Sequence, residues 1–188
     1  NGVIAAASVF MAQFYGADDK KHMQQTFRFV LIASSVIMTT FVVIALLFPE
    51  NIIRFFVKDD LVIQEGLSYI YIAALTFIPN MITLAIAGSM RATGDSRTPL
   101  VASVISMFTN AFFNYGFIYG NMGFPALGVA GGALGTLIAR IVELAFIGYF
   151  LATGSYAFKT RIRELFQISK TLVKRIVEKA LPIALNEV

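Results

Sequence analysis

Long uncharged apolar runs, separated by short charged connections, set the organisation of this chain. No Asp, Glu, Lys or Arg occurs over residues 29–48, 66–90 or 98–139. A helix needs about 20 apolar residues to cross the hydrocarbon core of a bilayer, so the first two runs each predict one crossing and the third is long enough for two. None of the runs shows the alternation of apolar and polar residues that a membrane β-strand requires. The pattern therefore predicts transmembrane helices.

Glycine and proline divide the longest run. The sequence YGNMGFP at 119–125 is typical of a turn, which places one span near 99–119 and the next near 127–153. Residues 2–15 have the composition of the end of an earlier span, and residues 179–188 have that of the start of a later one. We therefore expect an all-α membrane protein with four complete and two partial transmembrane helices. Because the first residue is Asn rather than Met, we also expect an internal segment of a longer chain.

The composition agrees with insertion into a membrane. Of the 188 residues, 57% are hydrophobic and 14% are charged, and the mean hydropathy is +0.75. A soluble domain is about half apolar and about a quarter charged. Cysteine is absent, so the chain holds no disulfide framework and no thiolate metal site, and the single histidine, His22, is too few for a histidine cluster. These numbers exclude a disordered chain and a disulfide-stabilised secreted domain.

Basic residues alternate between successive connections. The first, third and fifth connections (16–28, 91–98 and 155–175) carry three, two and six Lys or Arg, whereas the second and fourth (49–60 and 119–126) carry two and none. Cytoplasmic loops are enriched in Lys and Arg, so we expect the odd connections on the cytoplasmic side of the cell (inner) membrane. This topology accounts for the formal net charge of +4, and no nucleic-acid partner is needed to explain it.

The fifth connection repeats apolar residues at helical spacing, with basic residues between them. The apolar positions are Ile162, Leu165, Phe166, Leu172, Val173, Ile176, Val177 and Ala180. This pattern favours an amphipathic helix lying in the membrane interface, anchored by anionic head groups, over a solvated loop with accidental periodicity.

Polar side chains inside a span are informative because lipid offers them no hydrogen-bonding partner. In the span 99–119, Asn110 and Asn114 stand four residues apart and therefore share one helical face, with Ser103 and Ser106 nearby. Burying an amide without a partner is costly, so this face should point into the helix bundle. It either holds neighbouring helices together or lines a functional cavity, and the residues alone leave both readings open.

The following span opens with closely spaced glycines. Gly128 and Gly132, and likewise Gly131 and Gly135, are small residues four apart, which lets a neighbouring backbone approach closely. We expect these glycines to serve packing, with Thr136 able to reach across the contact.

Four other residues stand out within or near the spans. Arg140 and Glu143 can meet on one helix surface, and we expect them to neutralise each other. Pro79 removes a backbone donor in mid-span and bends its helix, either as a hinge or as a fixed shape. Glu187, in the last partial span, is a candidate for binding a cation or proton, or else an interface residue if that span begins later.

Catalytic chemistry finds little support in the sequence. No pair of carboxylates converges within the spans and no nucleophile stands beside a base. The glycines lack the Lys and Ser or Thr that would complete a phosphate loop. We therefore expect a protein that is not an enzyme and holds no cofactor or resident metal.

Three segments together resemble one transporter family. AQFYGADD (12–19) is similar to the end of the second helix of the multidrug and toxic compound extrusion (MATE) transporters, and SMRATGDSRTPL (89–100) to their loop between helices four and five. NAFFNYGFIYGNMGFPALGVAGGALGTLIARIVE (110–143) looks like their fifth and sixth helices. The resemblance covers nearly the whole chain and implies that it runs from the second helix to the opening of the seventh.

The resemblance implies half of a twelve-helix protein built from two lobes. Its parts would be a first-lobe transmembrane bundle at 1–154, a cytoplasmic amphipathic linker at 155–175 and the start of the second lobe at 176–188. It also implies export of organic, cationic drugs or toxic compounds in exchange for Na⁺ or H⁺. The partners would be small organic substrates, the bilayer and the second lobe of the same polypeptide.

By motif position, Asn110, Asn114 and Thr136 match a polar network that binds cation and substrate in this family. Some members carry Asp where this chain has Asn114, and an amide cannot titrate. Glu187 corresponds to an acidic position that some members use in the seventh helix.

Two rival functions stay open at this point. A lipid-linked oligosaccharide flippase of the same superfamily would be expected to line its cavity with more basic residues, and Arg140 is the only candidate in these spans. A membrane scaffold would show no efflux that depends on an ion gradient.

Overall fold

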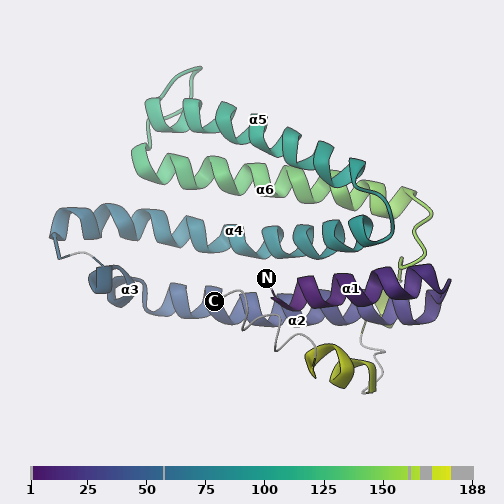
Figure 1. Cartoon of the computed structure of the whole chain (residues 1–188). Coiled ribbons are helices and arrows are strands. Elements are labelled where there is room, and N and C mark those ends of the chain that lie inside the picture. Colours follow the sequence, from purple (N-terminus) through teal and green to yellow (C-terminus); the bar gives the residue numbers. More distant parts are fainter. Residues whose placement is uncertain (1, 57, 161, 166–170, 179–188) are drawn as a thin grey trace. The chain divides into compact units, whose positions relative to one another are not determined.

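The described chain is built from helices joined by short connections. The computed structural model describes residues 2–56, 58–160, 162–165 and 171–178 (Figure 1). Within them it contains no β-strand, which confirms the all-α prediction. The helices are α1 (Gly2–Gly16), α2 (Lys20–Leu47), α3 (Pro49–Phe56), α4 (Asp60–Ala92), α5 (Arg97–Tyr119), α6 (Gly128–Thr153) and a 3₁₀-helix η1 (Ile162–Glu164).

Four of these helices are long and apolar enough to cross a membrane: α2, α4, α5 and α6. They correspond to the four predicted spans, and the shorter apolar α1 corresponds to the partial span at the start of the chain. The partial span predicted at 179–188 lies outside the described residues. The helices are longer than the apolar runs because helical backbone continues beyond the hydrocarbon core, so that α2 already begins at Lys20.

The short helix α3 lies in a connection that the sequence pattern presents only as a loop. Proline at its first position has a backbone angle suited to a helix start, and Glu50 lies in the first turn. The Arg54 Nε donates to Glu50 Oε1 at 2.8 Å, one turn away. Ile53 packs close to Gly66 in α4, where an added Cβ would come within 3.2 Å of the isoleucine side chain.

The turn between α5 and α6 falls where glycine and proline predict it. The backbone N–H of Leu127 donates to the Phe117 carbonyl at 2.7 Å, and the Phe124 ring lies against that of Phe117 with centroids 4.8 Å apart. Gly120 and Gly123 have φ values of 71° and 82°, which glycine adopts without steric cost. The turn therefore reverses the chain and sets α6 beside α5.

The chain forms two compact units, and α2, α4, α5 and α6 each contribute to both. Unit 1 contains residues 1–36, 81–101 and 146–188, and unit 2 contains residues 37–80 and 102–145. In unit 1, Ala7 of α1 packs in one buried cluster with Val30 of α2 and Ala85 of α4. Small side chains at this junction allow the three helices to approach closely.

The segment after α6 is attached to unit 1. Phe158 is fully buried, and its ring lies 4.9 Å from that of Phe27 in α2. Arg28 donates from Nε to the Thr160 hydroxyl and from Nη2 to Glu164 Oε2, each at 2.6 Å. These contacts hold the start of the predicted linker against the first helices of the chain.

Part of the predicted amphipathic helix in the membrane interface lies within the described residues. Residues 154–160 form turns and loop, η1 has three residues, and the described helix resumes only at 171–178. Its Leu172 and Ile176 are buried in a cluster with Phe10 of α1. These two residues of the apolar stripe therefore pack against protein, while Val177 of the same stripe is exposed. Phe166, Ala180 and most of the predicted start of the second lobe lie outside the described residues.

Asp95 holds the start of α5 and the segment after α6 together. Its Oδ1 accepts from the backbone N–H groups of Arg97 and Thr98, and its Oδ2 accepts from the Tyr156 hydroxyl at 2.6 Å. Burial on its own would raise the pKa of Asp95, but these hydrogen bonds outweigh it and hold the pKa below its ordinary value. The same burial, together with the bond to Asp95, raises the pKa of Tyr156.

A lowered pKa makes the contribution of Asp95 to stability depend on pH. The ionised carboxylate stabilises the fold above the ordinary pKa of 3.8, and this contribution is lost as the pH falls through the lower folded pKa. Asp95→Asn keeps a helix-capping oxygen and removes only the charge, so we expect it to cost about 1 kcal/mol at neutral pH. Thermal unfolding of the purified protein should show a gap in Tm between the two proteins that narrows below about pH 4. A gap that stays constant from pH 7 to pH 3 would contradict this.

Candidate functional site

Two glycines of α6 bring its backbone against α5. A Cβ added to Gly131 would lie 2.5 Å from the Phe117 carbonyl oxygen. A Cβ added to Gly135 would lie 3.0 Å from the backbone nitrogen of Asn114 and closer still to its side-chain oxygen. Real Cβ atoms essentially never come within 3.0 Å of another atom, so the contact at Gly131 requires glycine, and a side chain at position 135 would displace that of Asn114.

The other two glycines of the pattern, Gly132 and Gly128, make no such close contact with α5. A Cβ on Gly132 would meet only the Ile118 side chain, at an ordinary 3.5 Å. Gly128 has no atom within 4 Å of the position of a Cβ, and its φ is 55°. Gly128 therefore serves the backbone conformation at the start of α6 rather than the close packing expected for it.

A chain of side-chain hydrogen bonds crosses this helix contact. Asn114 Nδ2 donates to Asn110 Oδ1 at 3.0 Å, and Asn110 Nδ2 donates to the Thr136 hydroxyl at 3.0 Å. Thr136 in turn donates to the Gly132 carbonyl one turn back, at 2.9 Å. The three polar residues singled out in the sequence thus lie together, with α5 supplying both amides and α6 the hydroxyl.

One oxygen atom in this series of hydrogen bonds can still accept a hydrogen bond. Asn114 Oδ1 is buried and, among the described residues, has no hydrogen-bond partner. A buried carbonyl-type oxygen without a donor costs free energy, so a site with such an atom favours a group that can supply a proton or positive charge.

Asn110 and Thr136 face a polar cleft of about 480 Å³ between α5 and α6 in unit 2. Ser106 lies beside them and donates to the Ala139 carbonyl at 3.2 Å. The cleft is lined by Ser103, Ser106, Met107, Asn110, Thr136, Ala139, Arg140 and Glu143. Asn114 lies one turn further along and is held to this lining through Asn110.

An ion pair occupies the other end of the same cleft. Arg140 Nη1 donates to Glu143 Oε2 at 2.6 Å, as expected from their spacing. The second carboxylate oxygen, Oε1, accepts from the Ser103 hydroxyl of α5 at 3.2 Å. This contact across 40 residues is not predictable from the sequence, which places the acid only beside its arginine.

Pro79, which the sequence also singles out, does not line this cleft. Pro79 is buried in α4, which continues through it without interruption from Asp60 to Ala92. Glu187 lies outside the described residues.

A family model named MatE matches residues 1–116, which is more than half of the chain. The chain belongs to the MatE family. The family is one of multidrug efflux transporters embedded in membranes, in agreement with the resemblance seen in the sequence.

Two curated relatives show the extent of the likeness. The probable multidrug resistance protein YoeA of Bacillus subtilis is 24% identical to this MatE chain over 187 residues, which is 98% of the chain and 40% of YoeA. The probable multidrug resistance protein NorM of Thermotoga maritima is 35% identical over 104 residues, covering 52% of the chain and 20% of NorM. The chain spans about 40% of the length of YoeA.

Solved structures share the fold. An inward-facing multidrug resistance MATE family transporter superposes with a TM-score of 0.86 at 23% identity, covering 98% of this chain and 41% of that one. An outward-facing one gives a TM-score of 0.85 at 23% identity, covering 98% and 40%. The described helices therefore have the architecture of part of a MATE transporter.

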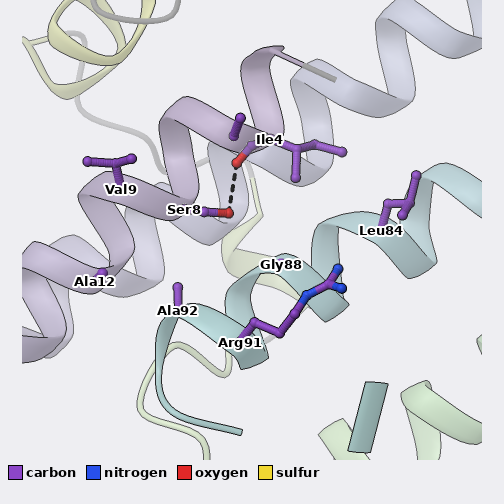
Figure 2. A pocket seen from close by; sticks show the side chains of 9 residues that line it. Ile4, Ser8, Val9, Ala12, Leu84, Gly88, Arg91 and Ala92 are labelled. Carbon is purple, nitrogen blue, oxygen red and sulfur yellow. Dashed lines mark hydrogen bonds between the residues drawn. The ribbon is translucent and has the colours of Figure 1, made fainter. Parts of the chain in front are cut away.

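A second hollow, of about 520 Å³, lies in unit 1 between α1 and the last turns of α4 (Figure 2). The Ser8 hydroxyl donates to the Ile4 carbonyl at 2.8 Å, so it is engaged within its own helix. Gly88 allows the approach, since a Cβ there would come within 3.2 Å of both residues. Apart from Ser8 and the exposed Arg91, the lining residues are apolar, and we assign no ligand to this hollow.

The difference between two neighbouring glycines gives a direct test of the helix contact. Gly135→Ala should push the Asn114 side chain away from Asn110 and cost about 2 kcal/mol, because the added Cβ overlaps the Asn114 side-chain oxygen and lies only 3.0 Å from the Asn114 backbone nitrogen. Gly132→Ala is the matched control on the same helix and should leave stability within about 0.5 kcal/mol or raise it. Thermal unfolding in detergent measures both, and equal stability of the two variants would contradict the contact.

Proposed function

We propose that the full-length protein is a secondary active antiporter that exports organic, cationic drugs or toxic compounds across the cell membrane in exchange for Na⁺ or H⁺. Asn110 and Thr136 would line the cavity for cation and substrate in this part of the transporter, and Asn114 would complete the network behind them. The observation that carries the proposal is a hydrogen-bonded polar chain, within two helices of membrane-spanning length, that opens on a cleft of about 480 Å³.

The chemistry of the cleft suits a cation better than an anion. Its lining offers hydroxyl and amide oxygens and one carboxylate, while its single guanidinium is already bound to that carboxylate. Oxygen ligands of this kind coordinate hard cations such as Na⁺. The rival flippase would be expected to line its cavity with more basic residues, and this lining holds one, Arg140.

Transport would follow from unequal binding to two conformations. A cation or drug that enters the cleft changes the hydrogen bonds of Asn110 and Thr136, and a ligand shifts a conformational equilibrium only by its difference in affinity for the two states. Coupling requires that ion and drug compete for this network.

Asn110→Leu tests the role of the amide. The substitution keeps the branched shape of the side chain and removes both hydrogen bonds, so we expect drug efflux by cells carrying the full-length protein to fall at least about tenfold while its amount in the membrane is unchanged. Thr109→Val is the matched control, since the one partner that the described residues give the Thr109 hydroxyl is the Ile105 carbonyl of its own helix. Full efflux by Asn110→Leu would assign the amides to helix packing alone.

Cysteine labelling tests the topology. Met122 is exposed in the turn between α5 and α6, and Ser96 is exposed between α4 and α5. In a cysteine-free background, a membrane-impermeant thiol reagent added to intact cells should label Met122→Cys and leave Ser96→Cys unlabelled. Labelling of Ser96→Cys from outside would reverse the orientation proposed from the basic residues.

A further inference from the structure

The two side chains of the Arg140–Glu143 ion pair in the cleft differ in how far they are exposed. The Glu143 side chain is 6% exposed, whereas that of Arg140 is 38% exposed. The carboxylate is therefore buried in the wall of the cleft between α5 and α6, and the arginine side chain is the more accessible partner. Both residues line the cleft together with Asn110 and Thr136.

Glu143 has side-chain partners on both α5 and α6, whereas the one described side-chain partner of Arg140 lies on its own helix. Glu143 Oε1 is held by the Ser103 hydroxyl on the facing helix, in addition to its bond from Arg140. The described residues give Arg140 one side-chain partner, which is Glu143. An arginine side chain is long and reorients by rotation about its side-chain bonds, so Arg140 can leave the carboxylate while Glu143 stays in place.

A buried carboxylate without a cation is strongly unfavourable, so any departure of Arg140 needs a replacement positive charge. An organic ammonium group that enters the cleft provides one. When the ammonium group replaces the guanidinium at Glu143 Oε2, the carboxylate remains paired with a positive charge. The Arg140 side chain, which is the more exposed of the two, is then hydrated by water in the cleft. The charge on the carboxylate is compensated before and after the exchange.

We infer that Glu143 selects for positively charged substrates and that Arg140 is its tethered counter-ion, which an incoming organic cation must displace. This inference rests on the proposed transport of organic cations and adds the residues that set charge selectivity. The arginine acts as an internal competitor: it keeps the buried acid paired when the cleft is empty and weakens cation binding by the free energy needed to displace it.

The competition predicts effects of opposite sign for the two partners. Arg140→Gln leaves Glu143 without its competitor, so a cation should bind more tightly by roughly an order of magnitude. Glu143→Gln removes the acceptor and should weaken binding by a similar factor. A pair that serves only to neutralise charge and stabilise the helix would instead weaken binding in both variants, or in neither.

The experiment measures equilibrium binding of rhodamine 6G, a fluorescent dye with a permanent positive charge, to the purified full-length transporter by fluorescence anisotropy. Rhodamine B shares its ring system but is zwitterionic, so its binding should change less than about twofold in either variant. Arg54→Gln and Glu50→Gln are the matched controls, because they break a similar ion pair in α3, outside the cleft.

Tighter binding of rhodamine 6G by Arg140→Gln and weaker binding by Glu143→Gln support the inference. Unchanged affinities, or parallel losses for both dyes, overturn it while leaving transport through the cleft intact. If either single variant is not recovered as folded protein, the double variant Arg140→Gln/Glu143→Gln replaces it in the test. Because this variant lacks the acid, it should bind rhodamine 6G more weakly than the wild type does. Wild-type affinity in the double variant would overturn the inference. Absence of rhodamine 6G binding and efflux in the wild type would overturn the proposed export of cations, and this inference with it.

Discussion

The close approach of the α5 and α6 backbones is the constraint on which the candidate site depends. Gly131 and Gly135 leave no room for a side chain where α6 meets Phe117 and Asn114. At this separation a hydroxyl on α6 reaches an amide on α5, and Thr136 and Asn110 bond across the interface. A larger residue at either glycine would separate the helices and break the chain of hydrogen bonds.

Polar residues within spans need partners, and here nearly all of them are supplied by the same two helices. The amides bond to each other and to Thr136, Ser106 bonds to a carbonyl of α6, and the buried acid has a hydroxyl and a guanidinium. Several residues of this network also line the cleft, so a ligand that enters it contacts polar groups that hydrogen bonds already hold in place. Because the network joins α5 to α6, a ligand that binds more tightly in one conformation of the transporter than in another would stabilise that conformation of both helices.

The sequence predicts the spans and the membership of the polar network, because apolar length and four-residue spacing are local properties. It does not predict α3, since an eight-residue helix falls below the length that a span requires. It also does not separate Gly135 from Gly132, because the difference lies in which residue of α5 faces each glycine. The stripe with Leu172 and Ile176 has the same pattern whether it meets lipid or protein, so only the fold places it against Phe10.

Water access to the cleft tests the central claim most directly. Met107 lines the cleft, and its neighbour Phe108 is exposed on α5 outside the lining. In a cysteine-free full-length transporter within membranes, Met107→Cys should react with a water-soluble charged thiol reagent, and an added organic cation should slow that reaction, whereas Phe108→Cys should not react. Equal inertness of both positions would show a dry helix contact, and the polar chain would then serve packing rather than transport.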